Sequence, residues 1–213
     1  MPRFVLLLCS ASPRRATLLQ KLEAPFQVLP VDVTETPLPG ENPWNTARRL
    51  ALSKLRAART EQPERYLLTA DTVVDLDGRP IGKPVSGEEA VRTLQALAGR
   101  PHLVHTAVAL SSPGFLGVVT CTTEVEMRPY TAREIEDSVA SGEPMDKAGA
   151  YAIQDPVFRP VCRIRGSYST VVGLPLAPTA RLLRERSVAI SAEVLRRAVK
   201  DEERAFREVA RAG

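Results

Sequence analysis

The sequence predicts an α/β domain with a mixed sheet and flanking helices. Patterns typical of buried strands alternate with amphipathic helical patterns along the chain. Two long strand patterns follow one another across a tight turn, which indicates antiparallel pairing, so the sheet is not expected to be wholly parallel. No linker rich in Gly or Ser divides the 213 residues, so we expect one compact unit with room for two lobes.

The first predicted elements are a short strand and a helix. Residues 4–9 form an unbroken apolar run, as in a strand that is buried on both faces, although a run this short also suits a helix segment. Ser12 is placed to cap the free amides of a helix over residues 13–23, and Pro13 suits its first position. Three leucines at helical spacing make this helix amphipathic.

A second helix and a hairpin follow. Asn42 and Pro43 begin a helix that runs to about residue 60. Residues 66–75 have the pattern of a mostly buried strand, and an Asp-Gly turn then leads into Ile81.

Two capping boxes mark the next helices. Ser86 with Glu89 begins a helix to about residue 98, and Thr131 with Glu134 begins one that ends near residue 141. The two long strands lie between these helices, at about residues 102–110 and 116–127.

The C-terminal part is less regular. Residues 161–176 are apolar and suit a strand or a helix, whereas the chain from residue 177 looks helical in two pieces. We expect residues 1–186 to form the domain and residues 187–213 to form a helical extension. The apolar stripe of this extension can pack on the core or on a partner.

Composition and charge narrow the class of protein. With 44% hydrophobic and 25% charged residues, the chain is typical of a globular domain. No apolar run approaches the roughly 20 residues that span a bilayer, so no membrane partner is expected. The net charge is +4, but residues 181–213 alone hold nine Lys/Arg and six Asp/Glu, so a nucleic-acid partner is not expected for the core. Three cysteines without metal-ligand spacing fit a reducing, cytoplasmic location.

Two adjacent arginines stand where a helix favours anions. Arg14 and Arg15 fall in the first turn of the predicted helix, whose amino end carries partial positive charge. Either they are solvated surface residues, or an anion binds there. Free amides, two serine hydroxyls and two guanidinium groups would all favour phosphate.

A carboxylate lies within the strand pattern ADTVV, residues 70–74. Asp71 would be costly to bury unless it is paired, bound to metal or neutralised. It is either a strand-end aspartate that caps a neighbouring amide, or a metal ligand or general base at the mouth of the sheet. Glu35, Lys54 and Lys83 are candidates to join it, although each alone suits a solvated charge.

The segment EPMDKAGAYAIQ, residues 143–154, contains the polar candidates Asp146, Lys147 and Gln154. It is either a specificity loop or a tight turn with polar residues in water. In a specificity loop, Gln154 would offer a donor and an acceptor to the imide edge of a base. Neither of the two histidines lies in a nucleophile pattern, so both are expected to be structural or surface residues.

Five motifs, taken in order, resemble the Maf family of nucleotide pyrophosphatases. They are SASPRRATLL at residues 10–19, ADTVV at 70–74, GKP at 82–84, DKAGAYAIQ at 146–154 and GSYSTVVGLPL at 166–176. The resemblance implies a fold related to inosine triphosphate pyrophosphatases, with the substrate in a cleft between two lobes. It also implies a homodimer and a cut between the α and β phosphates that depends on a divalent metal, Mg²⁺, Mn²⁺ or Co²⁺. The products would be a nucleoside monophosphate and pyrophosphate.

The resemblance implies a role for each motif residue. Asp71 would accept a proton from water and, with Glu35, hold the metal. The triphosphate would be held by Ser10, Arg14, Arg15, Lys54 and Lys83. Arg14, Thr72 and Gln154 match the branch similar to dTTP and UTP pyrophosphatases, not the branch that acts on 7-methyl-GTP. Pyrimidine triphosphates, including modified uridine nucleotides, are therefore the implied substrates.

The sequence departs from the family in two places. The family commonly has glycines after Gln154, whereas this chain has DPVFRP, which begins with Asp155 and Pro156, and the residues beyond about 186 have no counterpart. The first hypothesis is a house-cleaning hydrolase of non-routine or excess pyrimidine nucleotides. The alternative is a nucleotide or nucleic-acid binding regulator of cell division without essential catalysis. Its binding would survive the loss of Asp71 and fall steeply with salt.

Overall fold

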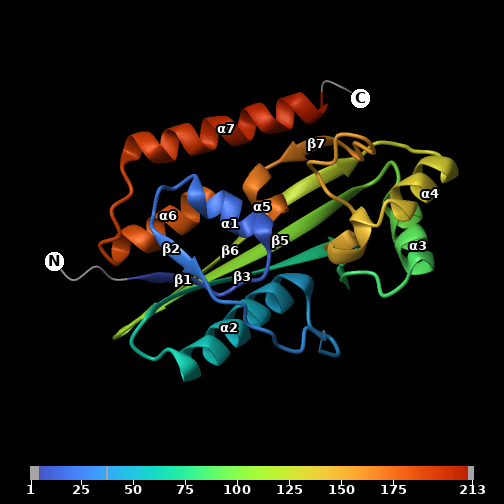
Figure 1. Cartoon of the computed structure of the whole chain (residues 1–213). Coiled ribbons are helices and arrows are strands. Elements are labelled where there is room, and N and C mark those ends of the chain that lie inside the picture. Colours follow the sequence, from blue (N-terminus) through green and yellow to red (C-terminus); the bar gives the residue numbers. More distant parts are fainter. Residues whose placement is uncertain (1–4, 37, 211–213) are drawn as a thin grey trace.

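A seven-stranded mixed sheet forms the centre of the structure (Figure 1). The structure is a computed structural model, and it describes residues 5–36 and 38–210. The strand order is β2-β1-β3-β5-β6-β7, with β4 paired to β3. β1 pairs parallel with β2 and β3, and all other pairs are antiparallel, so the predicted mixed sheet is confirmed. The strands are β1 (Leu6–Leu8), β2 (Phe26–Val28), β3 (Tyr66–Leu76), β4 (Arg79–Ile81), β5 (Pro101–Ser112), β6 (Phe115–Met127) and β7 (Val161–Arg165).

One edge of β3 is only partly covered. On that side β1 pairs with residues 66–68 and β4 pairs with residues 74–76. Residues 69–73 have no strand partner there in the described part of the chain, whereas β5 pairs with all of them on the other side. The sheet therefore has a gap beside Asp71 and Thr72.

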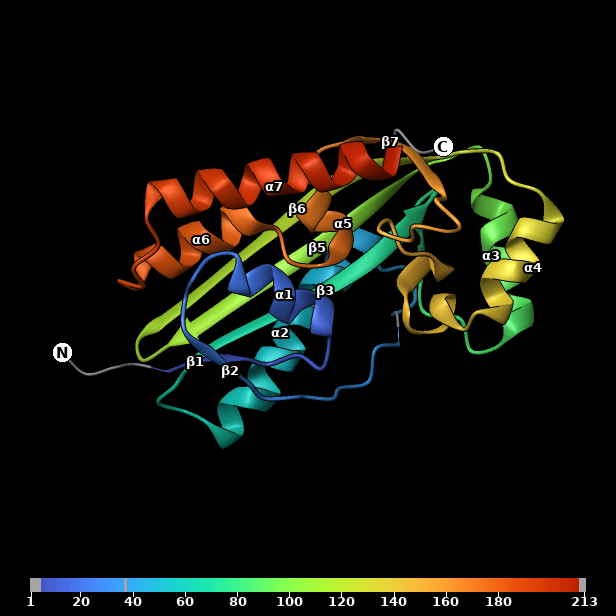
Figure 2. The ribbon, with the colours of Figure 1, turned by 45° about the horizontal axis from the view of Figure 1, so that its top comes forward.

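Helices cover both faces of the sheet (Figures 1 and 2). One face is covered by α2 (Pro43–Glu61). The opposite face carries α1 (Pro13–Gln20), α5 (Tyr168–Val172), α6 (Leu176–Glu185) and α7 (Ala192–Ala210). At one end of the sheet lie α3 (Gly87–Leu97), α4 (Ala132–Ala140) and the short 3₁₀ helices η1 (Glu143–Asp146) and η2 (Ala148–Ala150).

The alternation of side chains along the strands produces these layers, because successive residues point to opposite faces. Leu6 and Leu8 of β1 pack in the cluster of α1, α6 and α7, whereas Leu7 and Cys9 pack in the cluster of α2. The first strand is thus buried on both faces as predicted, although it is shorter than residues 4–9, and Phe4 lies outside the described residues. The edge strand β2 was not predicted.

Most predicted helix ends and turns are confirmed. The Asn42 side chain accepts a hydrogen bond from the Asn45 amide at 2.8 Å, and Thr131 with Glu134 forms a complete capping box. The turn before β4 has left-handed φ angles at Asp77 and Gly78, of 55° and 78°.

Two predicted caps are wrong in detail. Ser12 stands at the N-cap of α1 but its side chain makes no capping hydrogen bond, and its own amide donates to Ser10 Oγ at 3.2 Å. Ser86 accepts from the Glu89 amide, but the Glu89 carboxylate accepts from the Val85 amide and does not close the box. Because the Ser12 side chain does not cap α1, the amides of the first turn of this helix stay free.

The ambiguous segment, residues 161–176, contains both a strand and a helix. β7 ends at Arg165, and the next residue is Gly166, whose φ of +135° and close approach to Thr123 leave no room for a Cβ atom. α5 follows, and α6 and α7 are the two predicted helical pieces. No helix within residues 5–36 and 38–210 is both long and apolar enough to cross a membrane.

The two histidines, His102 and His105, are buried on β5 and support the structural interpretation. His102 Nε2 lies 2.8 Å from Tyr151 Oη, and burial lowers the pKa of His102 to about 4, so it is neutral at pH 7. His105 lies 3.1 Å from Asp75 and 2.8 Å from Thr122.

Candidate active site

A cleft of about 360 Å³ lies beside the gap in the sheet. It is lined by the β1–α1 turn, the loop after β2, the middle of β3, and the segment after α4. Every residue singled out for the site from the sequence lines it: Ser10, Arg14, Arg15, Glu35, Lys54, Asp71, Thr72, Lys83 and Gln154. Because the gap exposes the edge of β3, this cleft reaches side chains on both faces of the sheet.

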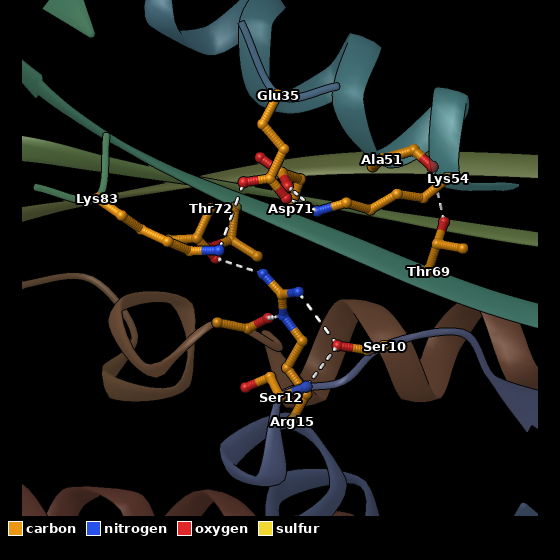
Figure 3. Close-up of polar contacts among 12 residues, drawn as sticks. Ser10, Ser12, Arg15, Glu35, Ala51, Lys54, Thr69, Asp71, Thr72 and Lys83 are labelled. Carbon is orange, nitrogen blue, oxygen red and sulfur yellow. Dashed lines mark hydrogen bonds and ion pairs between the residues drawn. The ribbon is translucent and has the colours of Figure 1, made fainter. Parts of the chain in front are cut away.

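A lysine links two carboxylates on the α2 side of β3 (Figure 3). Lys54 Nζ, from α2, lies 2.6 Å from Glu35 Oε1 and 2.5 Å from Asp71 Oδ1. Asp71 is 4% exposed and Lys54 is 7% exposed, so neither is a solvated charge. Asp71 lies in the middle of β3, and the interpretation as a strand-end cap is therefore wrong. Lys83 is more exposed, and its Nζ lies 3.5 Å from Glu35 Oε2.

The two carboxylates differ in acidity because their surroundings differ. Burial raises the pKa of Asp71, and the nearby charges of Lys54 and Arg15 only partly oppose this. Burial also acts to raise the pKa of Glu35, but hydrogen bonds and charge from Lys54 and Lys83 lower it overall. Asp71 is therefore the stronger base of the pair.

Arg15 fixes the opposite side of β3 to the β1–α1 turn. Its Nε donates to Gly173 O at 2.9 Å, and its two Nη atoms donate to Ser10 Oγ and Thr72 Oγ1, each at 3.3 Å. Gly173 has a φ of +117°, and a Cβ there would lie 3.3 Å from Arg15 Nε and 3.1 Å from Thr72 Oγ1. The glycine thus lets the backbone approach the guanidinium group.

A chain of hydroxyl groups orients Thr72. Thr106 Oγ1 donates its single proton to Thr170 O at 2.7 Å. In the 2.9 Å contact between the two threonines, Thr72 must therefore be the donor. Its oxygen is then left to accept from Arg15. Thr106 and Gly173 were not singled out from the sequence; the only signal for Gly173 was a glycine inside the apolar run VVGLPL.

Arg14 faces the segment after α4. Its Nη1 lies 3.1 Å from Asp146 Oδ2. Lys147 is 8% exposed, and its Nζ lies 2.6 Å from Asp146 Oδ1 and 3.0 Å from Glu143 Oε2. Lys147 is therefore buried and paired and does not face water, whereas the side chains of Glu143 and Asp146 are 65% and 64% exposed.

The departure after Gln154 forms a capped turn. Asp155 Oδ1 accepts from the amides of Val157 and Phe158, at 2.8 Å and 2.9 Å. Phe158 is buried against Tyr130, with ring centroids 4.9 Å apart. An aspartate cap and an aromatic anchor thus hold the segment beside Gln154, where glycines are common in the family.

The cleft suits a hard divalent cation only in part. No group of three or more His, Cys, Asp or Glu side chains among the described residues is arranged to hold a metal. Glu35 and Asp71 do converge on one point, which Lys54 Nζ occupies. Two carboxylates are the donor set of Mg²⁺ sites in which water and substrate phosphates supply the other ligands. The side chains therefore fit a metal that is shared with a phosphate ligand.

Comparison with known proteins agrees with these motifs. The family profile described as Maf-like protein matches residues 5–186. The dTTP/UTP pyrophosphatase of Thermomicrobium roseum is 48% identical, with 87% of this chain and 86% of that protein aligned. The dTTP/UTP pyrophosphatase of Koribacter versatilis is 43% identical, over 86% of this chain and 95% of its own.

Likeness to solved structures is weaker. The Ham1 protein of Staphylococcus aureus aligns with 95% of this chain and 97% of its own chain, at 17% identity and a TM-score of 0.47. That score is too low to support an argument. The family profile covers most of the chain, and the two relatives are 48% and 43% identical to it over the aligned residues, which confirms the resemblance. The chain belongs to the Maf-like protein family.

Proposed function

We propose that this protein hydrolyses dTTP and UTP, together with modified pyrimidine triphosphates, to nucleoside monophosphates and pyrophosphate. The relatives that align with most of the chain carry the name dTTP/UTP pyrophosphatase, which supports this substrate class. The observation that carries the proposal is the cleft itself. The carboxylates of Asp71, which is buried, and Glu35, which is exposed, lie on one side of β3, and Arg15 lies on the other (Figure 3). Arg14 lines the same cleft, so all four side chains are within reach of a single ligand.

The reaction breaks one phosphoanhydride bond. A water oxygen bonds to the α-phosphorus, the bond from this phosphorus to the α–β bridging oxygen breaks, and that oxygen leaves on pyrophosphate. The water proton passes to the Asp71 carboxylate, whose raised pKa makes it a better acceptor than an ordinary aspartate. Asp71 then returns the proton to solvent.

Cationic side chains hold the triphosphate in this proposal. Four cationic residues, Arg14, Arg15, Lys54 and Lys83, serve this role together with the hydroxyl group of Ser10. The free amides of the first turn of α1 add hydrogen-bond donors and the positive end of the helix dipole. These groups offset the charge of the triphosphate and of the leaving pyrophosphate.

Glu35 and Asp71 would hold a divalent cation, Mg²⁺, Mn²⁺ or Co²⁺. When bound, such an ion supplies positive charge at phosphate oxygens and lowers the pKa of water. Arg14, Thr72 and Gln154 select the base: Arg14 and Gln154 line the cleft, and Thr72 is fixed by Arg15 and Thr106. We also propose a homodimer and a cytoplasmic location.

A substrate panel tests the proposal. Purified protein is incubated with dTTP, UTP and 7-methyl-GTP in Mg²⁺ or Mn²⁺, and pyrophosphate release is measured. We expect dTTP and UTP to be hydrolysed in preference to 7-methyl-GTP. Turnover no greater than that of Asp71→Asn for all three nucleotides would contradict the proposal, and salt-sensitive nucleic-acid binding that survives this substitution would favour the alternative regulator.

A further inference from the structure

The C-terminal helix α7 buries a carboxylate on the face of the sheet that carries α1 and α5. α7 begins at Ala192, beyond the residues matched to the family, and crosses the outer side of α5 and α6 (Figures 1 and 2). Its inward face holds Ala198 at 1% exposure and Glu202 at 4%. A carboxylate in such a place is costly unless it is hydrogen bonded, so its partners indicate why it is there.

Glu202 binds the beginning of α5. Its Oε2 accepts from Ser167 Oγ at 3.2 Å and from the Ser169 amide at 3.4 Å. Its Oε1 is buried without a hydrogen-bond partner among the described residues, and burial raises the pKa of Glu202. By contrast, the next residue, Glu203, is exposed and faces Arg207 at 3.7 Å.

One helical turn connects Glu202 with Arg15. The Ser169 amide donates a hydrogen bond to Glu202. The Ser169 carbonyl accepts hydrogen bonds from the amides of Gly173 and Leu174, each at 2.9 Å. The Gly173 carbonyl in turn accepts Arg15 Nε at 2.9 Å. The position of the guanidinium group thus depends on where α7 holds α5.

We propose that Glu202 is a positioning residue. By holding α5 in place, it fixes the position of the Gly173 carbonyl, and this carbonyl orients the Arg15 guanidinium group toward the triphosphate. This inference rests on the proposed function for the identity of the ligand. It makes α7 part of the active-site framework and not only a cover for apolar surface.

The geometric part of the proposal is tested without any reaction. In ¹⁵N NMR spectra, the Arg15 Nε–H resonance, assigned by its loss in Arg15→Lys, reports the hydrogen bond to Gly173. We expect Glu202→Ala to shift or broaden it and to speed hydrogen exchange at the Gly173 and Leu174 amides. Glu203→Ala is the matched control and should change neither. Unchanged Arg15 and α5 signals in folded Glu202→Ala would overturn the proposal.

The functional part is tested by kinetics. We expect Glu202→Ala to raise KM for dTTP roughly tenfold with little change in kcat, because Arg15 binds phosphate in both the ground and transition states. Glu202→Gln should restore KM, since its carbonyl oxygen still accepts from Ser167 and Ser169. If the alanine variant does not fold, Glu202→Met takes its place, because it keeps the length of the side chain but removes the carboxylate oxygen that accepts these bonds. In an Arg15→Ala background, Glu202→Ala should cause no further rise in KM.

The outcomes separate this inference from the proposed function. Additive effects of the two substitutions on KM would overturn the positioning role of Glu202 even if the enzyme hydrolyses dTTP normally. If the protein hydrolyses no triphosphate, the proposed function fails, and the NMR comparison alone then decides whether Glu202 positions Arg15.

Discussion

Lys54 Nζ lies 2.5 Å from Asp71 Oδ1, so a cation already occupies the space in front of this carboxylate. The same nitrogen lies 2.6 Å from Glu35, and it therefore forms an ion pair with both carboxylates. A divalent cation that approaches these oxygens is repelled by the ammonium group until Lys54 moves or an anion accompanies the cation. Metal binding should therefore be weak in the absence of a nucleotide.

Replacing Lys54 by methionine should strengthen metal binding to the nucleotide-free protein. We expect the affinity for Mn²⁺, measured by electron paramagnetic resonance, to rise by roughly tenfold or more, because one nearby positive charge is removed. The variant should also lose thermal stability, since the buried Asp71 carboxylate loses its ion pair, and regain it with Mn²⁺. Lys83→Met is the matched control, because Lys83 is exposed and forms its ion pair with Glu35 at 3.5 Å. Equal Mn²⁺ affinities for Lys54→Met and the unsubstituted protein would contradict this account.

Replacing Asp71 by asparagine should remove the proton acceptor and leave the shape of the cleft. We expect kcat for dTTP to fall roughly 100-fold or more, while the protein stays folded. Because burial raises the pKa of Asp71 above its ordinary value of 3.8, the acid limb of kcat/KM should lie above that pH. Asp75→Asn, on the same strand but outside the cleft, should keep most of the activity. Equal losses of activity in both variants would show that activity depends on an intact strand β3 and not on Asp71 as the proton acceptor.

Replacing Gly173 by alanine should disturb Arg15 directly. At a φ of +117° the alanine is strained, and its Cβ would lie 3.3 Å from Arg15 Nε. We expect a loss of about 1 kcal/mol or more in unfolding free energy, together with a higher KM for dTTP. Gly87→Ala on α3 is the control, because its Cβ makes only an ordinary contact with Val139 at 3.4 Å. Urea unfolding and steady-state kinetics measure the two effects, and an unchanged KM would contradict the role of the Gly173 carbonyl.

Replacing Glu41 by glutamine should lower stability in a pH-dependent way. Glu41 accepts two hydrogen bonds of 2.7 Å from Arg49, which chiefly lower its pKa from 4.5 to about 2. The folded pKa is depressed, so the stabilisation is present above pH 4.5 and is lost as the pH falls toward 2. Urea unfolding at several pH values should show a large deficit for Glu41→Gln at pH 7 that shrinks below pH 4.5. Glu88→Gln, which alters an exposed pair with Arg92, should show no such trend.

Local signals allowed much of the fold to be predicted from the sequence. Asn42, Thr131 and the Asp-Gly turn act through atoms two to four residues away, so their effect can be read from neighbouring residues. The prediction that residues 66–75 form a mostly buried strand also follows from their apolar composition alone. β2 could not be predicted, because three residues with Val28 at 51% exposure give no strand pattern.

The contacts that organise the cleft could not be predicted from local sequence patterns. Arg15 and Gly173 lie 158 positions apart, and only the packed sheet brings them together. Glu202 likewise was not singled out from the sequence, because the serines that it binds are 33 and 35 residues away. Ser12 suited a cap by residue type, but its hydroxyl does not perform that role.

The gap between β1 and β4 also limits how far this fold can be stabilised. A strand that paired with residues 69–73 would complete the sheet and satisfy more of its backbone, yet it would fill the space through which one ligand reaches both Asp71 and Thr72. The open edge is also a place where another chain could pair. A more stable variant that still binds its ligand should therefore leave this edge unpaired. A variant in which an added strand closes the edge should have a higher melting temperature and should no longer bind the triphosphate.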